Sequence, residues 1–98
     1  MSSAARCLQL ALAAGKTAAG EGLIPAIQSG KARLVVYSDV SGANRTKKLQ
    51  DKCAYYHVPI YAMPAAEFDT ITRKALTALA VTDAGLAARC EEELRKDR

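Results

Sequence analysis

The segment ARLVVYS, residues 32–38, constrains the fold of this chain more than any other. It is a run of mainly apolar and β-branched residues, bounded by Gly30 on one side and Asp39 on the other. Apolar and polar residues do not alternate along it, so we expect a strand that is buried on both faces of its sheet. Because such a strand needs a layer of helices above and below, the segment predicts an α/β protein.

The rest of the chain supplies further strands and helices in alternation. Strands are predicted at residues 17–19, 58–63 and 76–82. Helices are predicted at residues 4–14, 20–29, from Ser41 to about 57, 65–71 and from Asp83 to the end. This order predicts a three-layer α-β-α sandwich, with a small mixed sheet of three to four strands and helices on both faces. The length suits one domain, residues 1–98.

Single residues predict helix starts and buried faces. Asp39 and Asp83 each follow a predicted strand and precede a predicted helix, which is where N-caps occur. Leu49, Cys53 and Tyr56 stand at helical spacing, and we expect all three to face inward.

The cysteines argue against a metal site and for a reducing compartment. Cys7, Cys53 and Cys90 are far apart and form no CxxC pair, and His57 is the only histidine. Each cysteine falls on a predicted helix, where a buried free thiol is expected. We therefore expect no cofactor or metal and a cytoplasmic location. The apolar stretch near the N-terminus is too short for a signal peptide or a membrane span, so no membrane partner is expected.

No set of catalytic side chains stands out. The aspartates that follow strands are interpreted as caps, and Asp51 lies among lysines as part of a solvated ion pair. His57 has no partner serine or cysteine at an informative spacing. The sequence therefore predicts a protein that is not an enzyme and has no small-molecule substrate.

Gly15-Lys16-Thr17 matches the last positions of a phosphate-binding P-loop. That motif requires an earlier glycine five residues before the Gly-Lys pair, where this chain has Leu10 inside a predicted helix. We interpret the segment as a small, flexible, cationic loop. Nucleotide binding through Gly15-Lys16-Thr17 remains a lesser alternative, which calorimetry with ATP and GTP tests.

The net charge of +4 and the pI near 9.1 favour polyanionic partners. Two connections combine charge with accessible backbone: residues 16–22, which lead into a helix N-terminus, and residues 72–75, TRKA, before the last strand. In an α/β sheet these two connections can share one end and form one cationic edge. The basic residues on the helix after Ser41 are interpreted mostly as solvated surface; they are Arg45, Lys47, Lys48 and Lys52.

Four segments carry a resemblance to a known family. AAGKTAAGEGL, SGKARLVVYSDVS, DKCAYYHVPIY and LAVTDAGLAAR occur in the order seen in the bacterial YlxQ-like branch of the ribosomal protein seven-Ae and thirty-e family. The resemblance extends from about Leu8 to Arg89. It implies an α-β-α sandwich that binds kink-turn RNA, a duplex bent sharply at an internal loop with sheared G·A pairs.

The resemblance also implies which residues contact RNA. In that family the helix after the short first strand enters the major groove at the G·A pairs, and the loop before the last strand supports an extruded nucleotide. Carried over to this chain, the implied RNA-binding residues are Lys16, Gly20, Glu21, Arg73, Lys74, Ala75 and Leu76. Many members carry an Asn-Glu pair with a lysine one turn later, whereas this chain has Gly20-Glu21, no lysine on that helix, and Pro25 within it.

Two functions follow as expectations. The first is a non-catalytic, monomeric RNA-binding protein that recognises kink-turn or otherwise bent structured RNA, ribosomal RNA included. The alternative is a protein–protein interaction module on the same scaffold with weakened RNA recognition. The missing lysine and the mixed-charge segment EEELRKDR favour the alternative.

Overall fold

The computed structural model describes residues 2–72 and 76–96, and these residues confirm the α/β architecture. The elements in chain order are α1 (Ser3–Ala13), β1 (Thr17–Ala19), the 3-10 turn η1 (Gly20–Gly22), α2 (Leu23–Gln28), β2 (Leu34–Ser38), α3 (Ala43–Tyr55), β3 (Ile60–Met63), α4 (Ala65–Phe68), β4 (Ala78–Val81) and α5 (Ala84–Lys96). Each predicted strand and helix is present, with ends that differ by a few residues.

The four strands form one mixed sheet in the order β1-β4-β2-β3. β4 pairs antiparallel with both β1 and β2, whereas β2 and β3 are parallel. The two central strands are therefore β4 and β2. Every residue of β4 is buried, and in β2 only Tyr37 is partly exposed. The predicted burial on both faces is confirmed for residues 34–38, whereas Arg33, just before β2, is exposed.

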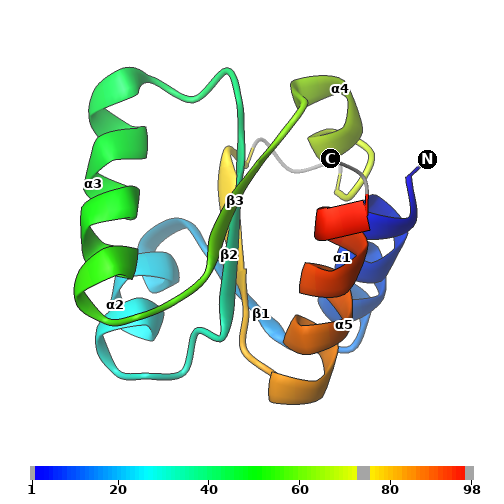
Figure 1. Ribbon diagram of the computed structural model, residues 1–98, viewed down its shortest axis with the longest axis horizontal. Helices are drawn as coiled ribbons and strands as arrows, with labels where there is room; N and C mark the ends of the chain where they lie inside the picture. The colour runs from blue at the N-terminus through cyan, green and yellow to red at the C-terminus, as the bar shows by residue number, and fades with distance from the viewer. Residues whose placement is uncertain (1, 73–75, 97–98) are drawn as a thin grey trace.

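Helices cover both faces of the sheet (Figure 1). α2 and α3 lie on one face, and α1, α4 and α5 lie on the other. The side chains of the central strands alternate between two cores, as the period of a strand requires. The core against α1, α4 and α5 receives Leu34, Val36, Leu79 and Val81. The core against α2 and α3 receives Val35, Ala78 and Ala80, and the two small alanines leave room for helix side chains.

The two predicted aspartate caps have different outcomes. Asp83 caps α5 as predicted, because its Oδ2 accepts a hydrogen bond from the N–H of Leu86 at 2.9 Å. Asp39 was expected to cap the helix that follows it, and this expectation is wrong. Its Oδ1 accepts from the N–H of Ala65 at 3.1 Å, at the start of α4. The parallel pairing of β2 with β3 brings Asp39 beside the end of β3, where its own N–H donates to the carbonyl of Met63 at 2.9 Å.

The predicted inner face of α3 is only partly right. Leu49 and Cys53 are buried, but Tyr56 is 37% exposed. α3 ends at Tyr55, and His57 adopts the left-handed conformation with φ of 58°. Helical spacing no longer determines the direction of a side chain once the helix has ended, which explains the error at Tyr56.

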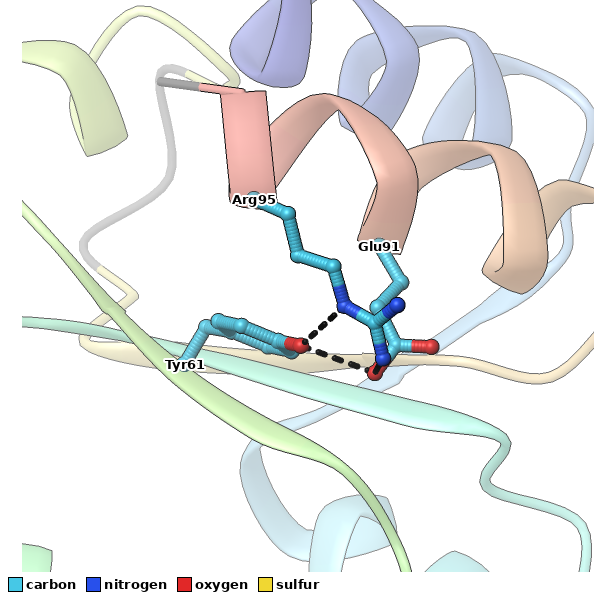
Figure 2. Close-up of polar contacts among 3 residues, drawn as sticks. All are labelled: Tyr61, Glu91 and Arg95. Carbon is cyan, nitrogen blue, oxygen red and sulfur yellow. Dashed lines mark hydrogen bonds and ion pairs between the residues drawn. The ribbon is translucent and has the colours of Figure 1, made fainter. Parts of the chain in front are cut away.

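A polar network joins β3 to α5 (Figure 2). The Tyr61 hydroxyl donates to Glu91 Oε2 at 2.9 Å and accepts from Arg95 Nε at 3.2 Å. Arg95 Nη2 also lies 3.6 Å from Glu91 Oε2. The hydrogen bond with Tyr61, followed by the charge of Glu91, raises the pKa of Arg95. These contacts fix the C-terminal half of α5 over the edge strand β3, on the face opposite α2 and α3.

All three cysteines are free and buried, as expected. Burial raises the pKa of the Cys53 thiol to about 11. Burial and a hydrogen bond with Cys7 raise the pKa of Cys90 further. Within residues 2–72 and 76–96, no cluster of histidine, cysteine and acidic side chains has the arrangement of a metal site. None of the described helices is long and apolar enough to cross a bilayer.

Candidate nucleic-acid interface

A pocket of about 540 Å³ opens at the end of the sheet where β1 and β2 end and β4 begins. We call it the α2–α3 pocket. Three segments line it, and their residues are Gly20, Leu23, Ile24, Asn44, Arg45, Lys48, Leu49, Leu76, Thr77 and Ala78. The antiparallel pairing of β1 with β4 explains the arrangement, because it places the start of η1 next to the residues that enter β4.

The pocket has an apolar floor and a cationic rim. Leu23 and Leu49 are buried beneath it, whereas Leu76 is partly exposed at its side. Arg45 and Lys48 are exposed at the rim. An apolar floor of this kind accepts a flat ring, and the adjacent cations attract an anion such as a phosphate.

Thr77 fixes the position of the Arg45 guanidinium. Arg45 Nη1 donates to Thr77 Oγ1 at 3.0 Å. The carbonyl of Thr77 accepts from the N–H of Ser38 at 2.8 Å and from the hydroxyl of Ser41 at 3.2 Å. These bonds connect the end of β2, the start of α3 and the entry to β4. The cation is therefore held at the rim of the α2–α3 pocket.

The turn from β1 into η1 depends on glycine. Gly20 has φ of +60°, and no atom lies within 4 Å of the place where a β-carbon would stand. Its conformation, and not crowding, thus requires glycine, since the left-handed region costs other residues about 1–2 kcal/mol. No side chain caps the start of η1, α2 or α3. The Leu23 N–H at the start of α2 donates to the Gly20 carbonyl, whereas the first N–H groups of η1 and α3 carry partial positive charge.

The predicted site residues fall in different places. Gly20 and Leu76 line the α2–α3 pocket together, and Glu21 is exposed on η1 next to Gly20. Lys16 is exposed at the opposite end of β1, where its carbonyl accepts from the N–H of Thr82 at 2.9 Å. Arg73, Lys74 and Ala75 lie outside the described residues.

Three polar residues of α3 line the pocket and were not among the predicted site residues. Asn44 was not considered, and Arg45 and Lys48 were interpreted as solvated surface. Both cations are indeed exposed, but they face the same pocket as Gly20 and Leu76. Asn44 and Arg45 stand four and three residues before Lys48, and these spacings put each of them next to Lys48 on the helix surface. The sequence therefore indicated a shared polar helix surface, but it did not indicate which other segments of the protein lie next to that surface.

Comparison with known proteins identifies relatives over most of the chain. No protein-family model matches it. The RNA-binding protein YlxQ of Bacillus subtilis (strain 168) is 37% identical over 83 residues, which cover 82% of this chain and 83% of that protein. The RNA-binding protein YlxQ of Enterococcus faecium is 34% identical over 85 residues, which cover 85% of this chain and 82% of that protein. The chain belongs to the YlxQ family.

Solved structures share the fold of this YlxQ-family chain. A protein of unknown function from Bacillus halodurans C has a TM-score of 0.89 and 26% identity, covering 97% of this chain and 99% of its own. The 15.5 kD RNA-binding protein of Giardia lamblia has a TM-score of 0.73 and 12% identity, covering 94% of this chain and 84% of its own. At that low identity the second likeness shows the fold alone.

Proposed function

We propose that this YlxQ-family chain is a non-catalytic RNA-binding protein that recognises kink-turn or similarly bent RNA. The observation that carries the proposal is the α2–α3 pocket, which joins an apolar floor to two exposed cations. Proteins recognise folded RNA mainly by shape, by phosphate contacts and by bases splayed out of the stack. The names of the two curated relatives support the same function.

The pocket suits a nucleotide that a sharp bend has extruded from its duplex. Ile24 and Leu76 would pack against the base, because both are partly exposed apolar side chains at the pocket wall. Arg45 and Lys48 would neutralise the adjoining phosphates and supply a salt-dependent part of the affinity.

The start of η1 would read the bases next to the bend. Glu21 is exposed there, and its carboxylate can accept a hydrogen bond from a base amine. The uncapped N–H groups near Gly20 can donate to base or phosphate oxygens. A glutamate also repels phosphate, so this position favours a base edge over the backbone.

The remaining implied residues extend the same interface. We propose that Arg73 and Lys74 contact phosphates and that Ala75 supports the extruded base beside Leu76. Lys16 would contact the RNA backbone at the other end of β1. We propose that the protein acts as a monomer, and its three buried thiols, which form no disulfide, suit the reducing cytoplasm.

Two RNAs that differ only at the bend test the proposal. The first is a kink-turn RNA with its sheared G·A pairs, and the second carries Watson–Crick pairs at those positions. We expect tighter binding to the first in gel-shift or fluorescence anisotropy titrations, and we expect Leu76→Ala to reduce the difference between the two RNAs. Equal affinity for both RNAs, or no binding to either, contradicts the proposal.

A further inference from the structure

A second concave surface lies on the other side of α2. It is a groove of about 760 Å³ between the start of β1, the outer side of α2 and the connection from α2 to β2. We call it the β1–α2 groove. Figure 1 shows the connection from α2 to β2 at the opposite end of the sheet from the connection between β2 and α3. The α2–α3 pocket and the β1–α2 groove thus lie on two sides of one short helix.

The β1–α2 groove carries positive charge with no acid among its lining residues. Lys31 and Arg33 line it, and both are exposed. Lys16 is exposed immediately before Thr17, a lining residue, and is hydrogen-bonded through its carbonyl to a second lining residue, Thr82. Among residues 2–72 and 76–96 the ion pairs within 4.0 Å lie on α5, so none of these cations has a carboxylate partner at that distance.

The two acids nearest in sequence do not neutralise the groove. Asp83 follows Thr82, and its Oδ2 accepts from the N–H of Leu86 at the start of α5. Glu21 belongs to η1 and stands between Gly20, which lines the α2–α3 pocket, and Gly22, which lines the groove. Lys16, Lys31 and Arg33 outnumber these two acids, so the groove keeps an excess of positive charge, which attracts a polyanion.

The form of the groove favours a polymer over a small anion. Its cations are exposed and no buried side chain closes around a central point, so it is not a cage for a single ion. Exposed cations bind nucleic acid by releasing the counterions condensed along its backbone, which a free phosphate ion does not carry. The hydroxyl groups of Thr17 and Thr82 can donate to phosphate oxygens along the same line.

The spacing connects the groove to the α2–α3 pocket. Lys16 and Gly20 flank the three residues of β1, and four residue steps of about 3.3 Å place them about 13 Å apart along the strand. Phosphates of one strand of duplex DNA follow each other at about 3.4 Å along the helix axis, and the spacing in an RNA stem is of the same order. An RNA stem that leaves the pocket along α2 would therefore place its backbone at the groove within about four base pairs.

We propose that the β1–α2 groove binds the phosphate backbone of an RNA stem that flanks the bend, with Lys16, Lys31 and Arg33 as the contacts. This inference rests on the proposed function, because the α2–α3 pocket sets the position of the stem. The groove adds affinity and stem-length dependence, while the pocket recognises the bend.

The test combines two variants with two RNAs. The double variant Lys31→Gln/Arg33→Gln removes two groove cations, and Lys47→Gln/Lys52→Gln removes two cations of α3 that line neither site. One kink-turn RNA has full stems, and the other is truncated next to the bend. With full stems, affinity falls as salt rises, and we expect the groove variant to reduce the magnitude of the slope of log affinity against log salt by about 1.4–1.8. The α3 variant should leave this slope near the wild-type value.

With the truncated RNA, we expect the groove variant to bind as the wild type does. Three results overturn the inference: unchanged affinity and slope with full stems, an equal loss in the α3 variant, or an equal loss with the truncated RNA. Wild-type binding to the truncated kink-turn RNA, compared with its Watson–Crick control, tests the pocket separately. If the wild type shows no preference there, the proposed function fails and the inference fails with it.

Discussion

Replacing Arg45 with alanine tests the α2–α3 pocket most sharply without damaging the fold. Its guanidinium is exposed, lines the pocket and donates to Thr77 Oγ1 at 3.0 Å. In the free protein, Arg45→Ala therefore removes one solvent-exposed hydrogen bond. We expect the free energy of unfolding to fall by no more than about 1 kcal/mol.

The expected effect on RNA binding is larger. A hydrogen bond to a charged group contributes about 1.5–3 kcal/mol, and each 1.4 kcal/mol is tenfold in affinity. If Arg45 contacts a phosphate, Arg45→Ala should weaken binding by about 10- to 150-fold. The magnitude of the negative slope of log affinity against log salt should decrease by about 0.7–0.9.

A neighbouring lysine provides the matched control. Lys47 is exposed on the same helix, but it lines neither the α2–α3 pocket nor the β1–α2 groove. Lys47→Ala removes the same charge, and we expect a loss of less than about fivefold. Thr77→Val keeps Arg45 but removes its hydrogen-bond acceptor, so its loss should lie between the two.

Fluorescence anisotropy with a labelled kink-turn RNA, repeated over a series of salt concentrations, gives both the affinity and the slope. Thermal unfolding of each variant verifies that the fold is intact. Equal losses from Arg45→Ala and Lys47→Ala would refute the reasoning, because binding would then depend on net charge and not on the pocket.

The remaining predictions concern stability. Phe68 is 1% exposed in the core against α1 and α5, and Phe68→Ala should lower the free energy of unfolding in urea by about 3–5 kcal/mol. His57 has φ of 58°, a conformation that glycine adopts more easily. His57→Gly should therefore increase the free energy of unfolding by about 1 kcal/mol, which urea unfolding measures as a higher midpoint. Burial raises the pKa of Cys53 from 9.0 to about 11. The unfolded thiol therefore ionises at lower pH than the folded one, and stability should be complete below pH 9 and decline towards pH 11. Unfolding curves across this window should show a smaller decline for Cys53→Ala than for the wild type.

The central sheet was predictable because its signal is local. The apolar runs in β2 and β4 need cover on two faces whatever the rest of the chain does, so their burial followed from the lack of alternation within each run. The cap at Asp83 was likewise local, since the aspartate and the helix it caps are adjacent.

The errors at Asp39 and Tyr56 have nonlocal or terminal causes. Asp39 caps a helix that begins 26 residues later, and only the parallel pairing of β2 with β3 brings the two together. Tyr56 stands one residue beyond the end of α3, where a helical pattern stops applying. End positions are the least certain part of any periodic pattern.

The α2–α3 pocket required the topology of the sheet. The charges of Arg45 and Lys48 were visible in the sequence, but their proximity to Gly20 and Leu76 depends on β4 lying between β1 and β2. The same topology puts Lys16 at the far end of β1, although it is close to Gly20 in the sequence.

Mapping RNA contacts by nuclear magnetic resonance tests the central claim most directly. A kink-turn RNA is added to the ¹⁵N-labelled protein, and the shift of each backbone amide is followed. The account expects the amides of Gly20, Asn44 and Thr77 to shift most, because their residues line the α2–α3 pocket. Shifts confined to α1 and α5, with those three amides unmoved, would contradict it.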